Sequence, residues 1–151
     1  MTGYRISNQQ YSQDLSGEGA RLFGARWNSV GIPMLYLSSH ASLSILELLV
    51  HVQWKQMGLT LDLLSIRLPD QAPAKELTAG KLKKNWQQDL AYTRSLGDGF
   101  IQSGQFLVLK VPSVIVPEEY NLLVNPRHPD ARKIRISYTR HFKPDQRLIS
   151  T

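Results

Sequence analysis

Cysteine is absent from the 151-residue sequence. This absence excludes disulfides, thiolate nucleophiles and cysteine-based zinc or iron sites, and it fits a reducing compartment. Histidine is scarce, and none of the four residues has the H-E-x-x-H spacing or a similar spacing of metal ligands, so we expect no metal. The histidines are His40, His51, His128 and His141.

Long apolar runs are also lacking. No stretch approaches the roughly 18 uninterrupted apolar residues of a membrane-spanning helix, and the first residues lack the basic and apolar regions of a signal peptide. The glycine motifs G-x-G-x-x-G and G-x-x-x-x-G-K-[ST] do not occur. We therefore expect a cytoplasmic protein with no membrane contact and no doubly wound nucleotide-binding fold.

What the sequence does contain fits one domain spanning residues 1–151. Hydrophobic residues make up 42% of the chain, which is enough to fill a single core. The formal net charge of +6 suits an anionic partner, such as nucleic acid, a phosphorylated small molecule or an acidic protein. The basic residues are scattered and do not form one block with interleaved aromatics, which argues against a dedicated nucleic-acid-binding module without removing that alternative.

Periodicity and breaker residues predict a single compact α+β domain. Its short mixed or antiparallel strands surround one buried helix. Strands are predicted at residues 33–38, 59–68, 106–111, 113–117 and 133–142, with an extended segment at 121–129. Helices are predicted at residues 41–54, 86–95 and 100–103, the last two separated by a break at residues 97–99, and residues 70–85 are expected to be mostly loop.

Glu47 is the most informative single residue. Its predicted helix is apolar almost all round, and an unpaired carboxylate is expensive to bury, so Glu47 needs either a partner or a task. His51 lies four residues further on the same helical face and is the candidate partner. The alternative is a glutamate on the one solvated stripe of the helix, forming a weak pair with His51.

Four other polar side chains stand out. Arg26 lies in a glycine-flanked turn, where its guanidinium can contact phosphate oxygens or simply cover Trp27, and Arg5 has the same two interpretations. Tyr36 lies in an otherwise apolar strand, so its hydroxyl needs a partner. The simpler interpretation is an ordinary tyrosine of the hydrophobic core. Ser113 has no G-x-S-x-G context and is read as an edge-strand serine.

The order of several motifs resembles the RES domain, the toxin family of the RES-Xre toxin–antitoxin modules. The motifs are YRIS, G-A-R-W-N-S-x-G, Y-L-S, A-S-L-x-x-L-E-x-x-x-H, V-P-S-x-x-V-P-E-x-x-N-x-L-x-N-P-x-H-P-D and H-F-K-P-D-Q-R-L. They extend from about Tyr4 to Leu148. The resemblance is loose between Arg67 and Leu96.

The resemblance implies a fold similar to ADP-ribosyltransferase toxins and an enzyme that consumes NAD⁺ as its substrate, with no cofactor. It implies an Xre-type helix-turn-helix antitoxin as partner, and a homo-oligomer within that complex is one alternative. Carried over by motif, the functional residues are Arg5, Arg26, Tyr36, Glu47 and Ser113. Glu47, Tyr36 and Arg26 are the expected catalytic residues, and all five are expected to bind NAD⁺.

The roles that follow are hypotheses. Glu47 stabilises the positive charge that builds at the ribose carbon as nicotinamide leaves. Arg5 and Arg26 hold the pyrophosphate, Tyr36 stacks on or walls the nicotinamide ring, and Ser113 hydrogen-bonds its carboxamide or the ribose. Water, inorganic phosphate or a protein side chain can each accept the ADP-ribose. We favour loss of free NAD⁺ over ADP-ribosylation of a protein, because no long segment of the sequence stands out as a protein-docking element.

Overall fold

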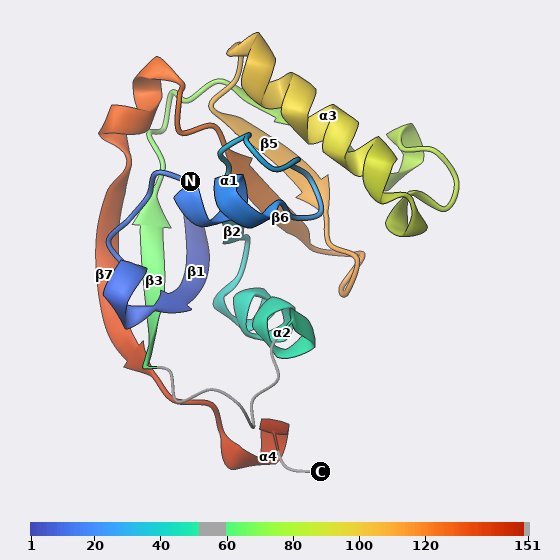
Figure 1. Ribbon diagram of the computed structural model, residues 1–151. Coiled ribbons are helices and arrows are strands. Elements are labelled where there is room, and N and C mark those ends of the chain that lie inside the picture. The colour runs from blue at the N-terminus through green and yellow to red at the C-terminus, as the bar shows by residue number, and fades with distance from the viewer. Residues whose placement is uncertain (52–59, 150–151) are drawn as a thin grey trace.

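A mixed sheet of seven strands forms the frame of the molecule (Figure 1). In this computed structural model, which describes residues 1–51 and 60–149, the strands are β1 Thr2–Asn8, β2 Leu35–Ser38, β3 Leu61–Arg67, β4 Ala74–Glu76, β5 Val108–Pro112, β6 Tyr120–Val124 and β7 Arg135–Phe142. The α-helices are α1 Glu18–Phe23, α2 Ala41–His51, α3 Leu90–Ser103 and α4 Gln146–Ile149. The predicted α+β class is confirmed.

The strands follow the spatial order β4-β5-β6-β2-β1-β3-β7. Only β4 and β5 run parallel; every other neighbouring pair of these strands is antiparallel. Among the described residues, no helix is long and apolar enough to cross a membrane.

The sheet is split near its centre. β1 pairs with β3 along its whole length, but it pairs with β2 at one position, Tyr4 opposite Ser38. Away from that pair the two strands diverge, so β1, β3 and β7 form one half of the frame and β2, β6 and β5 form the other (Figure 1). Helix α2 follows directly after β2 and packs against both β1 and β2, which places it beside the split.

Helix α2 is less buried than its composition indicates. Only Leu43 and Ser44 are fully buried, while Leu46 and Val50 are exposed. One side of the helix covers the end of the half that contains β1, β3 and β7, where Ile45 and Leu48 pack on a small cluster around Leu61, Leu63 and Phe142. The apolar sequence therefore predicted more burial of this helix than the structure shows. The predicted continuation of the helix over residues 52–54 lies outside the described residues.

Helix α3 runs without interruption through the glycines that were expected to break it. Asp89 caps its start by accepting a hydrogen bond from the Tyr92 backbone N–H, and Gly104 ends it in the left-handed conformation at φ 65°. The preceding segment, Trp86–Gln88, is a separate 3₁₀ turn. Gly97 is required for packing: a Cβ atom there would lie 1.6 Å from the Trp27 carbonyl oxygen. Tertiary contact has overridden local propensity.

We expect Gly97→Ala to lower the free energy of unfolding by about 1–3 kcal/mol or more, because the added methyl group overlaps the Trp27 backbone. Gly99→Ala is the matched control on the same helix, since a Cβ there meets nothing within 4 Å. Alanine has the higher helix propensity, so this control should gain up to about 1 kcal/mol. Chemical denaturation measures both changes, and equal effects of the two substitutions would refute the packing role of Gly97.

Several other sequence predictions need correction. Residues 113–117 form a turn and not a strand, because Ser113 binds the backbone N–H groups of Ile115 and Val116. Tyr138 is exposed, since a register shift in the β3–β7 pairing between Ser65 and Ile66 breaks the expected alternation. The short elements β1, α1 and β4 were not anticipated at all.

Candidate active site

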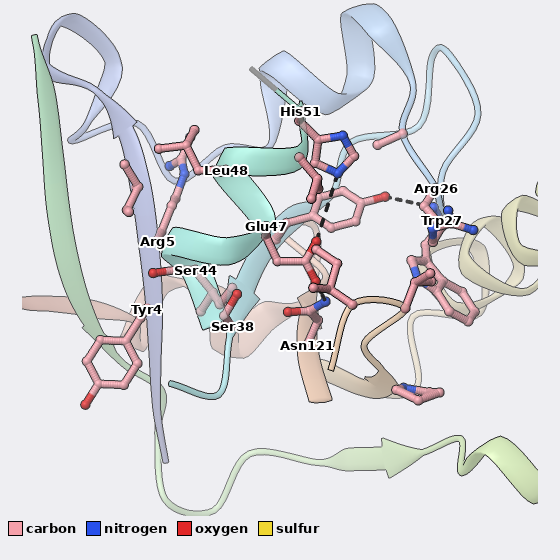
Figure 2. Close-up of a pocket in the computed structure, with 18 of the residues that line it drawn as sticks. Tyr4, Arg5, Arg26, Trp27, Ser38, Ser44, Glu47, Leu48, His51 and Asn121 are labelled. Carbon is pink, nitrogen blue, oxygen red and sulfur yellow. Dashed lines mark hydrogen bonds and ion pairs between the residues drawn. The ribbon is translucent and has the colours of Figure 1, made fainter. Parts of the chain in front are cut away.

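An open cleft of about 680 Å³ lies at the split in the sheet. It is lined by parts of β1, β2, α2, the loop after α1 and the ends of β5 and β6. Four of the five predicted site residues line it, namely Arg5, Arg26, Tyr36 and Glu47. Figure 2 shows Glu47 in the middle of this cleft, with Arg5 on the β1 side and Arg26 beside Trp27 on the opposite side. Residues distant in sequence therefore share one site.

Glu47 projects from α2 into the cleft, with 24% of its side chain exposed. Its Oε1 atom accepts two hydrogen bonds, from Asn121 Nδ2 at 2.8 Å and from Ser113 Oγ at 3.1 Å. Its Oε2 atom lies 4.0 Å from Nε2 of His51, whose side chain is largely exposed. The carboxylate is thus anchored through one oxygen by the strand side of the cleft, and the pair with His51 adds little because solvent screens it.

Ser113 lies behind Glu47 and does not line the cleft. It is only 1% exposed, and its Oγ accepts hydrogen bonds from the backbone N–H groups of Ile115 and Val116, both at 3.1 Å. With its lone pairs used in this way, the hydroxyl proton is directed to Glu47 Oε1. The geometry therefore gives Ser113 a hydrogen bond to the Glu47 carboxylate, and the direct ligand contact expected from the sequence stays a prediction.

Sequence reasoning missed Asn121 and Ser38, which face each other across β6 and β2 and both line the cleft. Asn121 is a polar residue at the start of an otherwise apolar strand, and that position was the available signal. What the sequence could not show is its partner, because Glu47 lies 74 residues away along the chain.

Tyr36 serves as an anchor for the loop that carries Arg26. Its hydroxyl donates to Asn28 Oδ1 at 2.7 Å and accepts from the Trp27 backbone N–H at 3.1 Å. Burial raises the pKa of this hydroxyl above its ordinary value, so it stays protonated near neutral pH. The ring lines the cleft while the hydroxyl is occupied, which is the arrangement of an apolar wall and not of a general base.

The rest of that loop is fixed by its own turn and by α3. Asn28 is fully buried, and its Nδ2 donates to three backbone carbonyls, as expected for a residue that satisfies a turn. From α3, Thr93 Oγ1 donates to the Arg26 carbonyl at 2.6 Å and Arg94 Nε donates to the Ala25 carbonyl at 2.8 Å. Arg26 itself donates through Nη1 to the Gln87 carbonyl at 2.9 Å. The backbone that carries the Arg26 guanidinium is therefore held in place.

Replacing Tyr36 with phenylalanine should keep the ring and remove the anchor. The Trp27 N–H and Asn28 Oδ1 lose a partner, which costs about 1–3 kcal/mol of stability for a buried polar group. We expect a lower melting temperature and a weaker affinity for an anionic ligand held by the loop. Thermal unfolding and ligand titration measure these two effects. Tyr92→Phe is a control, because within the described residues that hydroxyl accepts only from the Lys83 N–H, at an exposed position. Unchanged values for both quantities would contradict the anchoring role.

Arg5 supplies the second positive charge. It lies on β1 at the edge of the cleft, and its Nη1 donates to the Asp14 carbonyl at 2.7 Å. Burial lowers the pKa of the guanidinium below its ordinary value, and the Asp14 carboxylate offsets part of this effect. An arginine remains protonated under such a shift because its ordinary pKa lies far above neutral pH. The cleft therefore has two cationic sides with a carboxylate between them.

Metal chemistry has no candidate ligand set here: within residues 1–51 and 60–149, no group of three or more His, Asp or Glu side chains could hold an ion. The elements of the site are instead a carboxylate held by two donors, two guanidinium groups and an aromatic wall. Such a set can bind an anionic ligand at its ends and stabilise positive charge at its centre.

The sequence model of the RES domain matches residues 2–148. The chain belongs to the RES domain family. The resemblance read from the motifs is therefore confirmed over nearly the entire length, including the segment between Arg67 and Leu96 where the motifs are loose.

Curated relatives of this RES domain carry toxin names. The chain is 42% identical over 142 residues to a protein of Sphingobium sp. named Prs ADP-ribosylating toxin, covering 91% of this chain and 88% of the relative. It is 38% identical over 138 residues to Toxin Res of Pseudomonas putida, covering 90% and 93% of the two chains. A third relative, Toxin Res of Photorhabdus laumondii, is 33% identical over 150 residues, covering 97% and 96%.

Among solved structures, the fold matches a chain in the crystal structure of the M. tuberculosis MbcT-MbcA toxin–antitoxin complex. The TM-score is 0.79, and the match covers 99% of this RES domain and 89% of that chain at 22% sequence identity. At this identity the match establishes the shared fold.

Proposed function

We propose that this RES domain is the toxin of a toxin–antitoxin pair and that it breaks the bond between nicotinamide and ribose in NAD⁺, so that the cell loses the cofactor. The observation that carries the proposal is the Glu47 carboxylate, held by Ser113 and Asn121 inside a cleft that Arg5 and Arg26 also line. The toxin names of relatives that are 33% to 42% identical support the assignment.

The chemistry follows from where charge develops. As the glycosidic bond breaks, its electron pair leaves with the nicotinamide nitrogen and the ribose carbon becomes electron-poor, as in glycoside cleavage. A preorganised carboxylate next to that carbon stabilises the transition state more than the ground state. We assign this role to Glu47 Oε2, the oxygen that does not bind Ser113 or Asn121.

The remaining residues bind and orient the substrate. Arg26 and Arg5 offer guanidinium donors to the pyrophosphate, and the Tyr36 ring walls the planar nicotinamide. A carboxylate at the centre of the cleft repels the phosphate backbone of a nucleic-acid strand. The cleft therefore favours a single dinucleotide over such a strand. Two of the scattered basic residues, Arg5 and Arg26, are thus assigned to a small anionic substrate.

The acceptor of the ADP-ribose decides the reaction name. With water or inorganic phosphate, an acceptor oxygen bonds to the ribose carbon and gives up a proton, so free NAD⁺ is consumed. A specific observation favours a second candidate: the 42% identical relative is named an ADP-ribosylating toxin, which points to a protein side chain as acceptor.

Product analysis separates these candidates. The purified chain is incubated with NAD⁺ in phosphate-free buffer, in phosphate buffer, and in a host lysate containing NAD⁺ with an isotope-labelled ribose. Mass spectrometry then identifies free ADP-ribose, ADP-ribose 1″-phosphate or labelled protein. We expect one of the first two products. Labelled protein would establish the second candidate, ADP-ribosylation of a protein, and intact NAD⁺ in every sample would refute the proposal.

The antitoxin is the expected macromolecular partner. The structural relative from M. tuberculosis is in a complex with an antitoxin, and we propose an Xre-type helix-turn-helix protein as the corresponding partner here. Such a partner would be expected to suppress the NAD⁺ turnover of the purified chain on mixing.

A further inference from the structure

We infer that Asn121 is a positioning residue, which fixes Glu47 Oε1 so that Oε2 is the oxygen presented to the ligand. The evidence begins with the hydrogen bond of 2.8 Å from Asn121 Nδ2 to Glu47 Oε1. Asn121 stands on β6 directly opposite Ser38 of β2, so its amide is carried by two paired strands. The bond therefore ties a side chain of the partly exposed helix α2 to the half of the sheet that contains β2 and β6 (Figure 2).

The other end of the same amide carries an energetic penalty. Asn121 Oδ1 is buried and has no hydrogen-bond partner among the described residues. Such unsatisfied acceptors are uncommon in folded proteins and call for an explanation. Turning the amide over would place Oδ1 against Glu47 Oε1, so two acceptors would face each other. The observed orientation is the one that keeps a donor on the carboxylate, at the expense of Oδ1.

Asn121 and Ser113 bind the same carboxylate oxygen. Both donors lie on the strand side of the cleft, and their two bonds restrict rotation of the carboxylate. The opposite oxygen, Oε2, accepts no hydrogen bond within the described chain and has the His51 Nε2 atom at 4.0 Å. This asymmetry distinguishes the two oxygens of Glu47 and assigns the ligand-facing role to Oε2. The assignment to ribose chemistry rests on the proposed function, whereas the positioning itself does not.

Asn121→Asp tests the inference because it preserves the shape of the side chain and replaces the donor with an acceptor. Two carboxylates at hydrogen-bond distance retain a shared proton at low pH, and that proton restores the missing donor. At high pH the shared proton is lost. We expect kcat for NAD⁺ to fall about 10- to 100-fold at pH 8, the scale of one hydrogen bond to a charged group, and the deficit to shrink toward pH 6. KM should change by less than about threefold, since Asn121 acts through Glu47.

A merely structural role would give a different pattern. It would lower activity by a constant factor at every pH, so parallel pH profiles for the variant and the wild type would overturn the inference. His51 is the other titratable side chain near Glu47, and it is present in both proteins. Gln105→Glu, an exposed amide outside the cleft, makes the same change in charge and should leave that ratio flat.

Crystal structures of the wild type and of Asn121→Asp at pH 8 give a readout that does not depend on turnover. The wild type should show the bond from Asn121 to Glu47, and in the variant the Glu47 carboxylate should turn away from the introduced carboxyl group. An unmoved Glu47 carboxylate in the variant at pH 8 would overturn the inference. If the wild type fails to consume NAD⁺, the proposed function is wrong and this structural comparison still decides the role of Asn121.

Discussion

Glu47→Gln should lower the turnover of NAD⁺ about 100-fold or more while the protein stays folded. The glutamine carbonyl oxygen can still accept the bonds from Ser113 Oγ and Asn121 Nδ2, so the hydrogen-bond arrangement on the strand side is preserved. The charge that faces the ligand is lost. Because that charge acts on a positive centre present only during bond cleavage, the loss should be in kcat more than in KM.

Steady-state kinetics with NAD⁺ measure this effect, and thermal unfolding confirms that the variant is folded. Glu119→Gln is the matched control: Glu119 Oε2 forms a comparable weak pair with a histidine, 3.4 Å from His40 Nδ1, but the residue does not line the cleft. The control should retain activity. A Glu47→Gln variant with full activity would remove the carboxylate from the mechanism.

Arg26→Ala should raise KM for NAD⁺ about 10- to 100-fold, with a smaller effect on kcat. The Arg26 guanidinium lies at the cleft on a loop whose backbone carbonyls are held by Thr93 and Arg94, so the backbone that carries it is fixed before a ligand arrives. Charge-assisted bonds to phosphate oxygens are worth about that factor. Arg26→Lys should fall between the wild type and alanine, because lysine keeps the charge but lacks the planar fork of donors.

Kinetics across a range of NAD⁺ concentrations separate KM from kcat for these variants. Arg21→Ala is the control, since Arg21 pairs with Glu18 on α1 and lies outside the cleft. Its removal takes away the same charge and a surface ion pair of little energetic value. If Arg26→Ala leaves KM unchanged, the pyrophosphate contact is wrong.

Glu47 could be found from the sequence, although for an incomplete reason. A carboxylate among apolar helical residues is conspicuous in the sequence, and the family motifs point to the same position. The structure shows that α2 is not buried on most sides. What makes Glu47 special is the pair of donors on the turn after β5 and on β6, 66 and 74 residues away. No local pattern encodes partners at such separations.

The errors in the fold have a similar origin. Glycines at positions 97 and 99 predict a helix break from local propensity, but Gly97 allows the helix to approach the Trp27 backbone. Alternating residues predict a regular final strand, but the register shift in the β3–β7 pairing exposes Tyr138. Ser113 looks like a strand residue because Val114 and Ile115 follow it, and only the folded chain shows that its hydroxyl closes a turn and binds Glu47. Tertiary contacts decided each of these cases.

The central claim is that Glu47 promotes cleavage of NAD⁺ between nicotinamide and ribose. The release of free nicotinamide tests this claim most directly, because cleavage yields nicotinamide with each of the three acceptors. The purified wild-type chain and Glu47→Gln are incubated with NAD⁺, and nicotinamide is quantified by chromatography over time. We predict steady release by the wild type and about 100-fold slower release by the variant. Equal rates of release from the two proteins, or intact NAD⁺ with the folded wild type, would contradict the account.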